Sequence, residues 1–194
     1  MKIGIFGGSF NPPHNMHRDI ALELIDNNCL DKVIFVPTGD SYVKNGLISF
    51  NDRYNMVKLM IKDIDLFLVS DIGNNLEYQY TYQVLDYFKD IYLNDEIYFI
   101  CGSDNLIEFD SWKKYQYILE NYKLLVIRRN NDDIDNIVLK YYKYIDRIII
   151  TNIESNMLSS SYIRDNIDND ISKYLDRDVY EYVRKNNLYL KKKR

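Results

Sequence analysis

The residues best suited to chemistry near neutral pH are concentrated at the start of the chain. Its two histidines, His14 and His17, lie in the segment 7–17, which reads GGSFNPPHNMH. All 3 prolines, and Gly4, Gly7, Gly8, Gly39 and Gly46 among the 7 glycines, fall within the first 46 residues. Gly and Pro mark unusual backbone geometry, and His titrates near neutrality. The segment therefore combines a shaped loop with tunable side chains.

The surroundings of this loop favour phosphate binding. It follows the apolar run 2–6 and precedes a helical pattern that begins near His17. The N–H groups at a helix N-terminus attract anions, and two imidazoles so close together can both donate hydrogen bonds to one phosphate. Such bonds strengthen as negative charge develops in a transition state. The loop matches neither G-x-G-x-x-G nor a Walker A motif. It therefore lacks the signature motifs of nucleotide redox enzymes and of P-loop NTPases.

Two other interpretations of the histidines are weaker. Zinc requires a third protein ligand, and neither an H-E-x-x-H motif nor a cysteine pair lies near His14 and His17. Incidental surface histidines would not be expected to gather in one Gly/Pro-rich turn. We therefore predict a phosphate site without a protein-held metal.

A second segment, LSSSYIR at 158–164, lies between another predicted strand and helix. One hydroxyl is enough to cap a helix, so three hydroxyls leave two for other partners. Arg164 follows one turn later, and a guanidinium binds phosphate oxygens through paired hydrogen bonds. Ser160, Ser161 and Arg164 therefore form a candidate polyphosphate cradle.

Short apolar runs alternate with helical patterns along the whole chain. The predicted strands cover 2–6, 32–36, 66–69, 96–101, 123–127 and 147–151, and the predicted helices cover 17–27, a segment after a Ser49-x-x-Asp52 cap, 81–91, parts of 104–119, 134–144, 161–168 and 178–185. This order predicts an α/β fold, a Rossmann-like parallel sheet with helices on both faces, in one domain over 1–194. The loops after the strands should then meet in one cleft.

The composition excludes several classes of protein. Hydrophobic residues at 46% and charged residues at 28% are typical of a globular chain. A net charge of −4 argues against general nucleic-acid binding, and no apolar run is long enough to span a membrane. Cys29 and Cys101 are isolated, which favours buried thiols in a reducing, cytoplasmic setting.

The two phosphate-site segments resemble the H-x-G-H and I-S-S-T-x-x-R motifs of a nucleotidyltransferase superfamily. Within it the chain resembles the bacterial nicotinate-nucleotide adenylyltransferases. Further similarities are Val36-Pro37-Thr38 with Lys44, Tyr80-Thr81, Gly102-Ser103-Asp104 with Trp112, Arg128-Arg129, and the C-terminal stretch to Tyr189. The resemblance implies a nucleotidylyl transferase fold and adenylyl transfer from ATP to nicotinate mononucleotide, in NAD biosynthesis, with Mg²⁺ accompanying ATP.

The resemblance also implies roles for individual residues. The catalytic set is His14, His17 and Arg164. The ATP-binding set is Gly8, Ser9, Phe10, His14, His17, Gly102, Asp104, Ser160, Ser161 and Arg164, and the set for the pyridine substrate is Lys44, Thr81, Trp112 and Arg129. From composition alone, Trp112 is better explained as a core or surface-anchor aromatic, and a helix N-cap after a strand is an equally ordinary explanation of Asp104.

The chain departs from the family pattern at two places. Met16 replaces the glycine of H-x-G-H, so a side chain could crowd the ATP site. Ser41-Tyr42-Val43 replaces the P-P-H before Lys44. Alternatives that stay open are an adenylyltransferase for nicotinamide mononucleotide or pantetheine phosphate, and a nucleotide-binding paralogue with impaired catalysis. The sequence also leaves open whether the chain forms a homo-oligomer.

Overall fold

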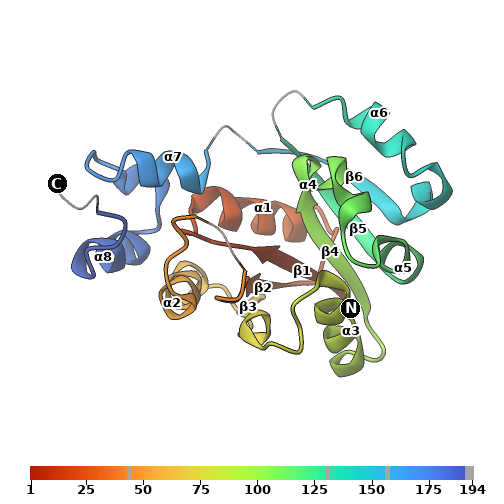
Figure 1. The fold of residues 1–194 in the computed structure, drawn as a ribbon, viewed down its shortest axis with the longest axis horizontal. Helices are drawn as coiled ribbons and strands as arrows, with labels where there is room; N and C mark the ends of the chain where they lie inside the picture. The colour runs from red at the N-terminus through yellow and green to blue at the C-terminus, as the bar shows by residue number, and fades with distance from the viewer. Residues whose placement is uncertain (43–44, 130–131, 156–157, 191–194) are drawn as a thin grey trace.

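A six-stranded parallel sheet forms the centre of the computed structural model (Figure 1). The structure describes residues 1–42, 45–129, 132–155 and 158–190. The strand order is β3-β2-β1-β4-β5-β6, and the strands are β1 (Lys2–Gly8), β2 (Lys32–Pro37), β3 (Phe67–Val69), β4 (Glu96–Gly102), β5 (Lys123–Arg129) and β6 (Ile148–Ser155). The predicted Rossmann-like fold class is confirmed.

The strands are apolar on both faces because both faces are covered by helices. In β4, Tyr98 and Ile100 contribute to one buried cluster, whereas Phe99 and Cys101 contribute to the other. This alternation follows from the two-residue period of a strand. It explains why the strand sequences are continuous apolar runs.

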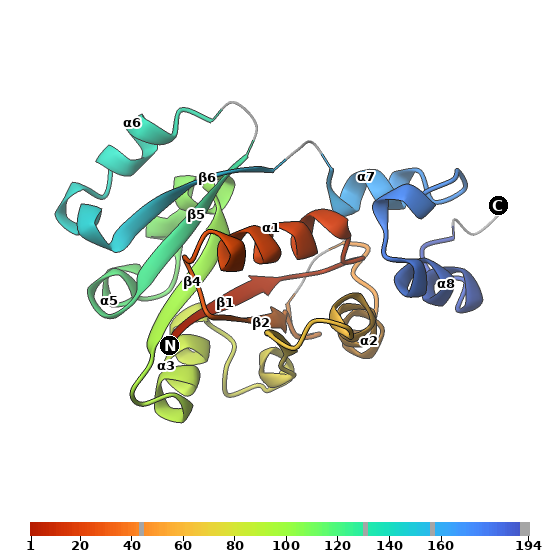
Figure 2. The same cartoon turned by 180° about the vertical axis from the view of Figure 1, so that it is seen from behind.

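One layer of helices packs against the face that contains Phe6, Phe35 and Ile100. Figure 2 shows α1 lying over the sheet, with α2 beside it and α7 and α8 beyond. This layer consists of α1 (Asn15–Asp26), α2 (Phe50–Ile61), α7 (Ser160–Asp165), the 3-10 helix η4 (Ser172–Tyr174) and α8 (Arg177–Lys185). The layer joins helices from both ends of the sequence.

The middle of the chain supplies the opposite layer, which packs on Ile5, Phe99 and Val126. Its elements are η1 (Ile72–Asn74), α3 (Thr81–Ile91), α4 (Ser103–Ile107), η2 (Phe109–Ser111), α5 (Tyr115–Asn121), α6 (Ile134–Leu139) and η3 (Tyr142–Arg147). The two layers together bury both faces of the sheet. Among the described residues, no helix has the length and apolar character needed to cross a membrane.

Most predicted elements occur within a few residues of their expected bounds. Ser49 caps α2 as predicted, accepting a hydrogen bond from the backbone N–H of Asp52 at 3.2 Å. The predicted helix over 134–144 was wrong in its length, since α6 ends at Leu139 and η3 follows it. Tyr144 has non-helical angles (φ −122°, ψ 21°), so the helical pattern does not continue through this segment.

The strand order reverses between β1 and β4, which pair in parallel from Lys2–Glu96 to Phe6–Ile100. On its other side β1 pairs in parallel with β2, and Gly8 lies opposite Pro37. Ligands of open parallel sheets bind beyond the carboxyl ends of the strands at such a reversal. The loops after β1, β2 and β4 are therefore expected at the centre of the site.

Candidate active site

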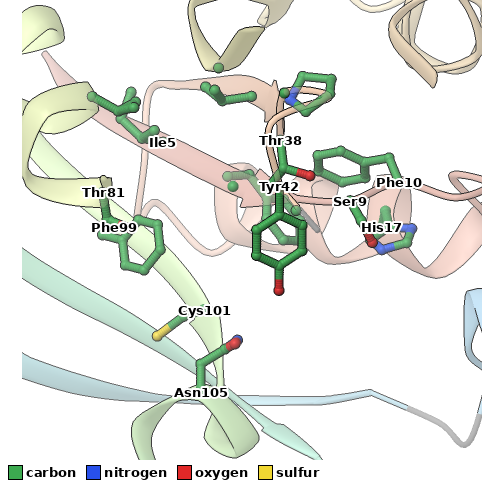
Figure 3. A pocket seen from close by; sticks show the side chains of 18 of the residues that line it. Ile5, Ser9, Phe10, His17, Thr38, Tyr42, Thr81, Phe99, Cys101 and Asn105 are labelled. Carbon is green, nitrogen blue, oxygen red and sulfur yellow. The ribbon is translucent and has the colours of Figure 1, made fainter. Parts of the chain in front are cut away.

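A cavity of about 790 Å³ opens at the carboxyl ends of β1, β2 and β4. Figure 3 shows Ser9, Phe10 and His17 together on one side and Thr81, Phe99, Cys101 and Asn105 on the other, with the ring of Tyr42 between the two groups. A cavity of this size accommodates a nucleotide-sized ligand. The predicted site residues that line it are Gly8, Ser9, Phe10, His14, His17, Thr81, Asp104, Trp112, Arg129, Ser160, Ser161 and Arg164.

The two histidines form a close pair at the start of α1. The ring centroids of His14 and His17 are 3.8 Å apart, with the planes tilted by 33°. The backbone N–H of His14 donates to Nδ1 of His17 at 3.2 Å. In a neutral imidazole the other nitrogen then carries the proton, so His17 keeps an Nε2–H donor for a ligand. Nδ1 of His14 is buried and has no hydrogen-bond partner among the described residues.

Burial keeps both imidazoles neutral. It lowers the pKa of His14 from 6.5 to about 3, and the charge of Arg129 acts in the same direction. Burial also lowers the pKa of His17 well below 6.5, and His14 and Arg129 lower it further. Since a buried cation lacks the solvation that water provides, the charged form of each ring is disfavoured. A bound polyphosphate would oppose this shift.

Phe10 fixes the ring of His17. Its side chain is 1% exposed, and its ring lies edge-on to His17 with the centroids 5.0 Å apart. Phe10 has a φ of 45°, a left-handed conformation that costs a bulky residue about 1–3 kcal/mol. A Cβ at Gly8 would lie 3.1 Å from the Phe10 ring, so glycine lets this ring turn inward. Packing under the histidines offsets the backbone strain.

The segment at 158–164 lies against the first loop, as the shared cavity requires. Ser159 caps α7 by accepting from the N–H of Tyr162 at 3.1 Å. The Ser160 hydroxyl donates to the carbonyl of Pro12 at 2.8 Å. Arg164 donates to the carbonyl of Asn11 at 2.7 Å and to the Ser161 hydroxyl at 3.0 Å. All three serines therefore line the cavity with Arg164, and one of them, Ser159, also caps the helix.

Asp104 and Arg129 face each other at the carboxyl ends of β4 and β5. The carboxylate accepts from Nη1 of Arg129 at 3.2 Å. Asp104 is not the helix N-cap that its position suggested, because Gly102 occupies that position and Asp104 lies in the first turn of α4. A side chain at Gly102 would collide with both partners, so glycine permits this ion pair.

The remaining part of the cavity is aromatic. Trp112 is half-buried and packs on Phe99 and Phe109, with centroid distances of 5.8 and 5.1 Å. Thr81 begins α3, and the cation of Lys113 lies 5.9 Å from the ring centroid of Tyr80. Trp112 is thus both a packing aromatic and a lining residue. Lys44, which was also predicted to bind the pyridine substrate, lies outside the described residues.

Met16 does not line this cavity. Its half-buried side chain packs against the cluster that contains Phe6 and Ile20. The crowding expected from replacing the family glycine therefore does not arise from this side chain in the structure.

The described cavity wall is more positive than the chain as a whole. Its charged residues are Asp104, Lys113, Arg129 and Arg164, which is three cations and one anion, although the chain carries a net charge of −4. Clefts lined by one sign of charge concentrate ligands of the opposite sign. The cavity is therefore suited to phosphate-bearing substrates.

Comparison with known proteins agrees with this geometry. The family described as Cytidylyltransferase-like matches residues 5–166. The chain belongs to this family. It is 36% identical to a protein of Endomicrobium trichonymphae and 34% identical to one of Acholeplasma laidlawii, both named "probable nicotinate-nucleotide adenylyltransferase". The matches cover 97% and 95% of this chain and 98% and 96% of those proteins.

Solved structures show a similar fold over almost the whole chain. The Plasmodium falciparum nicotinic acid mononucleotide adenylyltransferase superposes with a TM-score of 0.80 in its complex with APC and in its complex with NaAD. The identities are 26% and 25%, and each match covers 97% of this chain and 96% and 97% of the other. The predicted family and fold are confirmed.

Three residues that hold the site together are not among the predicted site residues. Arg53 and Asn11 are buried, and the hydroxyl of Tyr189 donates to Oδ1 of Asn11 at 3.0 Å. A signal exists for Arg53, because it lies on the same helical stripe as Met56, Val57 and Met60, where a charge is unexpected. The contact between Asn11 and Tyr189 has no local signal, since 178 residues separate them.

Proposed function

We propose that the chain transfers the adenylyl group of ATP to nicotinate mononucleotide. The 5′-phosphate oxygen of the acceptor attacks the α-phosphorus of ATP in line, the bond between the α-phosphorus and its bridging oxygen breaks, and pyrophosphate leaves. The product is nicotinate adenine dinucleotide. The full-length similarity to proteins named for this activity supports the substrate pair. The cavity supports the reaction class, because its wall combines phosphate-binding groups with an aromatic side.

This reaction needs no protein nucleophile or general base. A phosphate monoester has its second pKa near 6, so at pH 7 the acceptor phosphate is already largely a dianion. The work left to the protein is positioning and charge stabilisation, as in other phosphoryl-type transfers. A site with neutral histidines and cations at its edge fits that requirement.

The observation that carries the proposal is the paired, neutral imidazoles. The Nδ1 atom of His17 is occupied by the backbone N–H of His14, so the Nε2–H of His17 donates to a phosphate oxygen of ATP. His14 adds a second imidazole 3.8 Å away between ring centroids. Negative charge moves onto the leaving pyrophosphate during the reaction, and donors fixed in advance stabilise that charge. His17 acts on the reacting α-phosphate and His14 on the neighbouring phosphates.

Other lining residues take the remaining parts of the substrates. Arg164, Ser160 and Ser161 hold the triphosphate next to the loop that they already contact. Asp104 accepts from the ribose hydroxyls, with Gly102 making room and Arg129 available to phosphate. On the aromatic side, Trp112 stacks on the pyridine ring of the acceptor and the N-terminus of α3 at Thr81 lies beside it.

Magnesium enters this reaction with ATP. Among the described residues, no group of three or more His, Cys, Asp or Glu side chains is arranged to hold a metal ion. Among the described residues that line the cavity, Asp104 is the one carboxylate, and it forms an ion pair with Arg129. Mg²⁺ commonly keeps several waters and binds mainly through substrate phosphates, so Mg·ATP fits a site with few carboxylates. The ion reduces repulsion between the phosphates and the incoming acceptor.

A His17 variant tests the role of this side chain. We expect His17→Ala to lower kcat about 100- to 1,000-fold, the usual cost of losing one fixed transition-state donor. The dissociation constant for ATP should change by only about threefold, because a donor of this kind contributes mainly in the transition state. His17→Gln keeps an N–H donor in its side-chain amide, so its kcat should lie between those of the unsubstituted protein and His17→Ala. Near-normal turnover in His17→Ala would remove His17 from the mechanism.

Pyrophosphate release with a panel of acceptors tests the acceptor. The panel contains nicotinate mononucleotide, nicotinamide mononucleotide and pantetheine phosphate, each with Mg·ATP. We expect the highest kcat/KM with nicotinate mononucleotide. Turnover with another acceptor alone would reassign the enzyme, and ATP binding without turnover on any acceptor would favour an impaired paralogue. We further propose that 1–194 forms one nucleotidyltransferase domain, because both ends of the chain contribute to one phosphate site.

A further inference from the structure

A buried arginine lies behind the cavity wall without lining it. Arg53 is in the first turn of α2, and its side chain is 0% exposed. Burying a guanidinium is unfavourable unless its donors are paired. Asp40 supplies a countercharge at 3.2 Å, but that carboxylate is 58% exposed. The ion pair alone therefore does not explain why a charge is buried here.

The other donors of Arg53 bind three backbone carbonyls from two loops. Nη1 donates to the carbonyls of Ser9, at 3.1 Å, and Thr38, at 2.6 Å. Nε donates to the carbonyl of Ile48 at 3.0 Å. Ser9 belongs to the loop that leads to the histidines, whereas Thr38 and Ile48 lie at the two ends of the loop that carries Tyr42. One planar guanidinium thus holds both loops.

Asn11 makes a second link between the same loops. Its side-chain Nδ2 donates to the carbonyl of Gly46 at 2.8 Å, and its Oδ1 accepts from the N–H of Ile48 at 3.3 Å. Asn11 is 1% exposed. The two loops are therefore joined by buried, directional hydrogen bonds and not only by surface contact. A shift of one loop has to change the hydrogen bonds of the other.

We infer that Arg53 is a positioning residue that couples binding of ATP to binding of the acceptor. The inference rests on the proposed function, which places the ATP phosphates beside the loop containing Ser9 and the acceptor on the aromatic side of the cavity. Ser41 and Tyr42 of the second loop line that same cavity. One nitrogen of Arg53 bridges the carbonyls of Ser9 and Thr38. A ligand that holds one loop in its binding-competent position therefore also favours the binding-competent position of the other loop. Such coupling is reciprocal between the two ligands.

Binding measurements on Arg53 variants test the coupling. In the unsubstituted protein, saturating nicotinate mononucleotide should tighten the dissociation constant of a non-hydrolysable ATP analogue about fivefold or more, with the same factor in the reverse experiment. In Arg53→Met this factor should fall to about one, and both KM values should rise about tenfold as the competent arrangement becomes less populated. Arg53→Lys should recover only part of the coupling and of the KM values, because an ammonium keeps the charge and N–H donors but lacks the planar fork of a guanidinium.

Two further variants separate positioning from general stability. Met60→Ala removes a core side chain, 3% exposed, from the same helix, about two turns after Arg53. It should lower the urea midpoint while leaving both KM values and the coupling factor unchanged. Asp40→Asn keeps the three carbonyl contacts and should change the coupling factor by less than about twofold. If Arg53→Met does not fold, Arg53→Lys carries the comparison with Met60→Ala.

Three results would overturn the inference: no coupling in the unsubstituted protein, normal coupling in Arg53→Lys and Arg53→Met, or equal loss of coupling in Met60→Ala. Failure of the proposed function is a separate result. It appears as absent pyrophosphate release by the unsubstituted protein with every acceptor. The dissociation constant of the ATP analogue in Arg53→Lys and Met60→Ala still reports whether Arg53 positions the ATP loop.

Discussion

Replacing His14 by glutamine should make the protein less sensitive to mild acid. His14 is 4% exposed, and burial holds its pKa at about 3 against 6.5 for a free side chain. As the pH falls below 6.5, the unfolded chain takes up a proton at this position and the folded chain does not. The unfolded state then binds more protons, so the free energy of unfolding decreases as the pH falls. The loss continues until the pH reaches the pKa of the folded state.

The size of the effect follows from the two pKa values. At pH 5 the unfolded imidazole is about 1.5 units below its pKa, and each unit corresponds to about 1.4 kcal/mol, which gives a loss of about 2 kcal/mol relative to pH 7. His14→Gln has no group that titrates at this position. Its free energy of unfolding should therefore fall by about 2 kcal/mol less than that of the unsubstituted protein over the same interval. His17 remains in both proteins and contributes to both.

Urea unfolding at pH 7 and pH 5 measures the difference. Trp112 is the one tryptophan of the chain, so its fluorescence reports unfolding. The histidine signals in a proton NMR titration give an independent check, because there are only His14 and His17 to assign. Neither ring should titrate between pH 8 and pH 5 in the folded, ligand-free protein. An equal acid-induced loss in both proteins, or an NMR midpoint near 6.5 for His14, would refute the reasoning.

Two substitutions, one in the cavity wall and one next to it, give further predictions. Lys113→Met should raise the KM for nicotinate mononucleotide about two- to fivefold, the usual value of an exposed ion pair with an anionic ligand. Lys114→Met is the matched control and should leave this KM unchanged, because Lys114 lies over Tyr82 outside the cavity wall. Steady-state kinetics of the two variants decide this, and equal effects would argue against a local contact. Gly102→Ala should separate Asp104 from Arg129 and raise the KM for ATP about tenfold, while overpacking costs about 1 kcal/mol of stability. An unchanged KM for ATP would show that this ion pair does not shape the ATP site.

Local sequence patterns were sufficient for the framework of the fold. Continuous apolar runs identified the strands, and the helix at Thr81–Ile91 has the predicted bounds. The two segments of the proposed phosphate site, which line one cavity, also stand out in the sequence, because loops that join parallel strands to helices concentrate Gly, Ser and His. A parallel sheet brings the ends of its strands to one edge. Residues near those ends were therefore expected to meet.

The contacts that shape the site were not predictable in the same way. Arg53 has four polar acceptors in the segments 9, 38–40 and 48, and their arrangement exists only after the sheet has formed. Asp104 looked like a helix cap because its partner, Arg129, lies 25 residues later, at the end of β5. Met16 looked obstructive because sequence alone does not give the direction of a side chain on α1. Each case depends on tertiary contacts that no local pattern contains.

The hydrogen bonds of Asn11 and Pro12 have a consequence for how the protein is made. Their partners Ser160, Arg164 and Tyr189 follow them by 148, 153 and 178 residues. During synthesis the loop with the two histidines leaves the ribosome long before the groups that fix it. Because such distant contacts form late in folding, a growing chain presents its sheet before it has a finished nucleotide site. Until the segment with Ser160, Arg164 and Tyr189 has been synthesised, the loop lacks the contacts that fix it, so ATP is expected to stabilise such intermediates less than the folded protein.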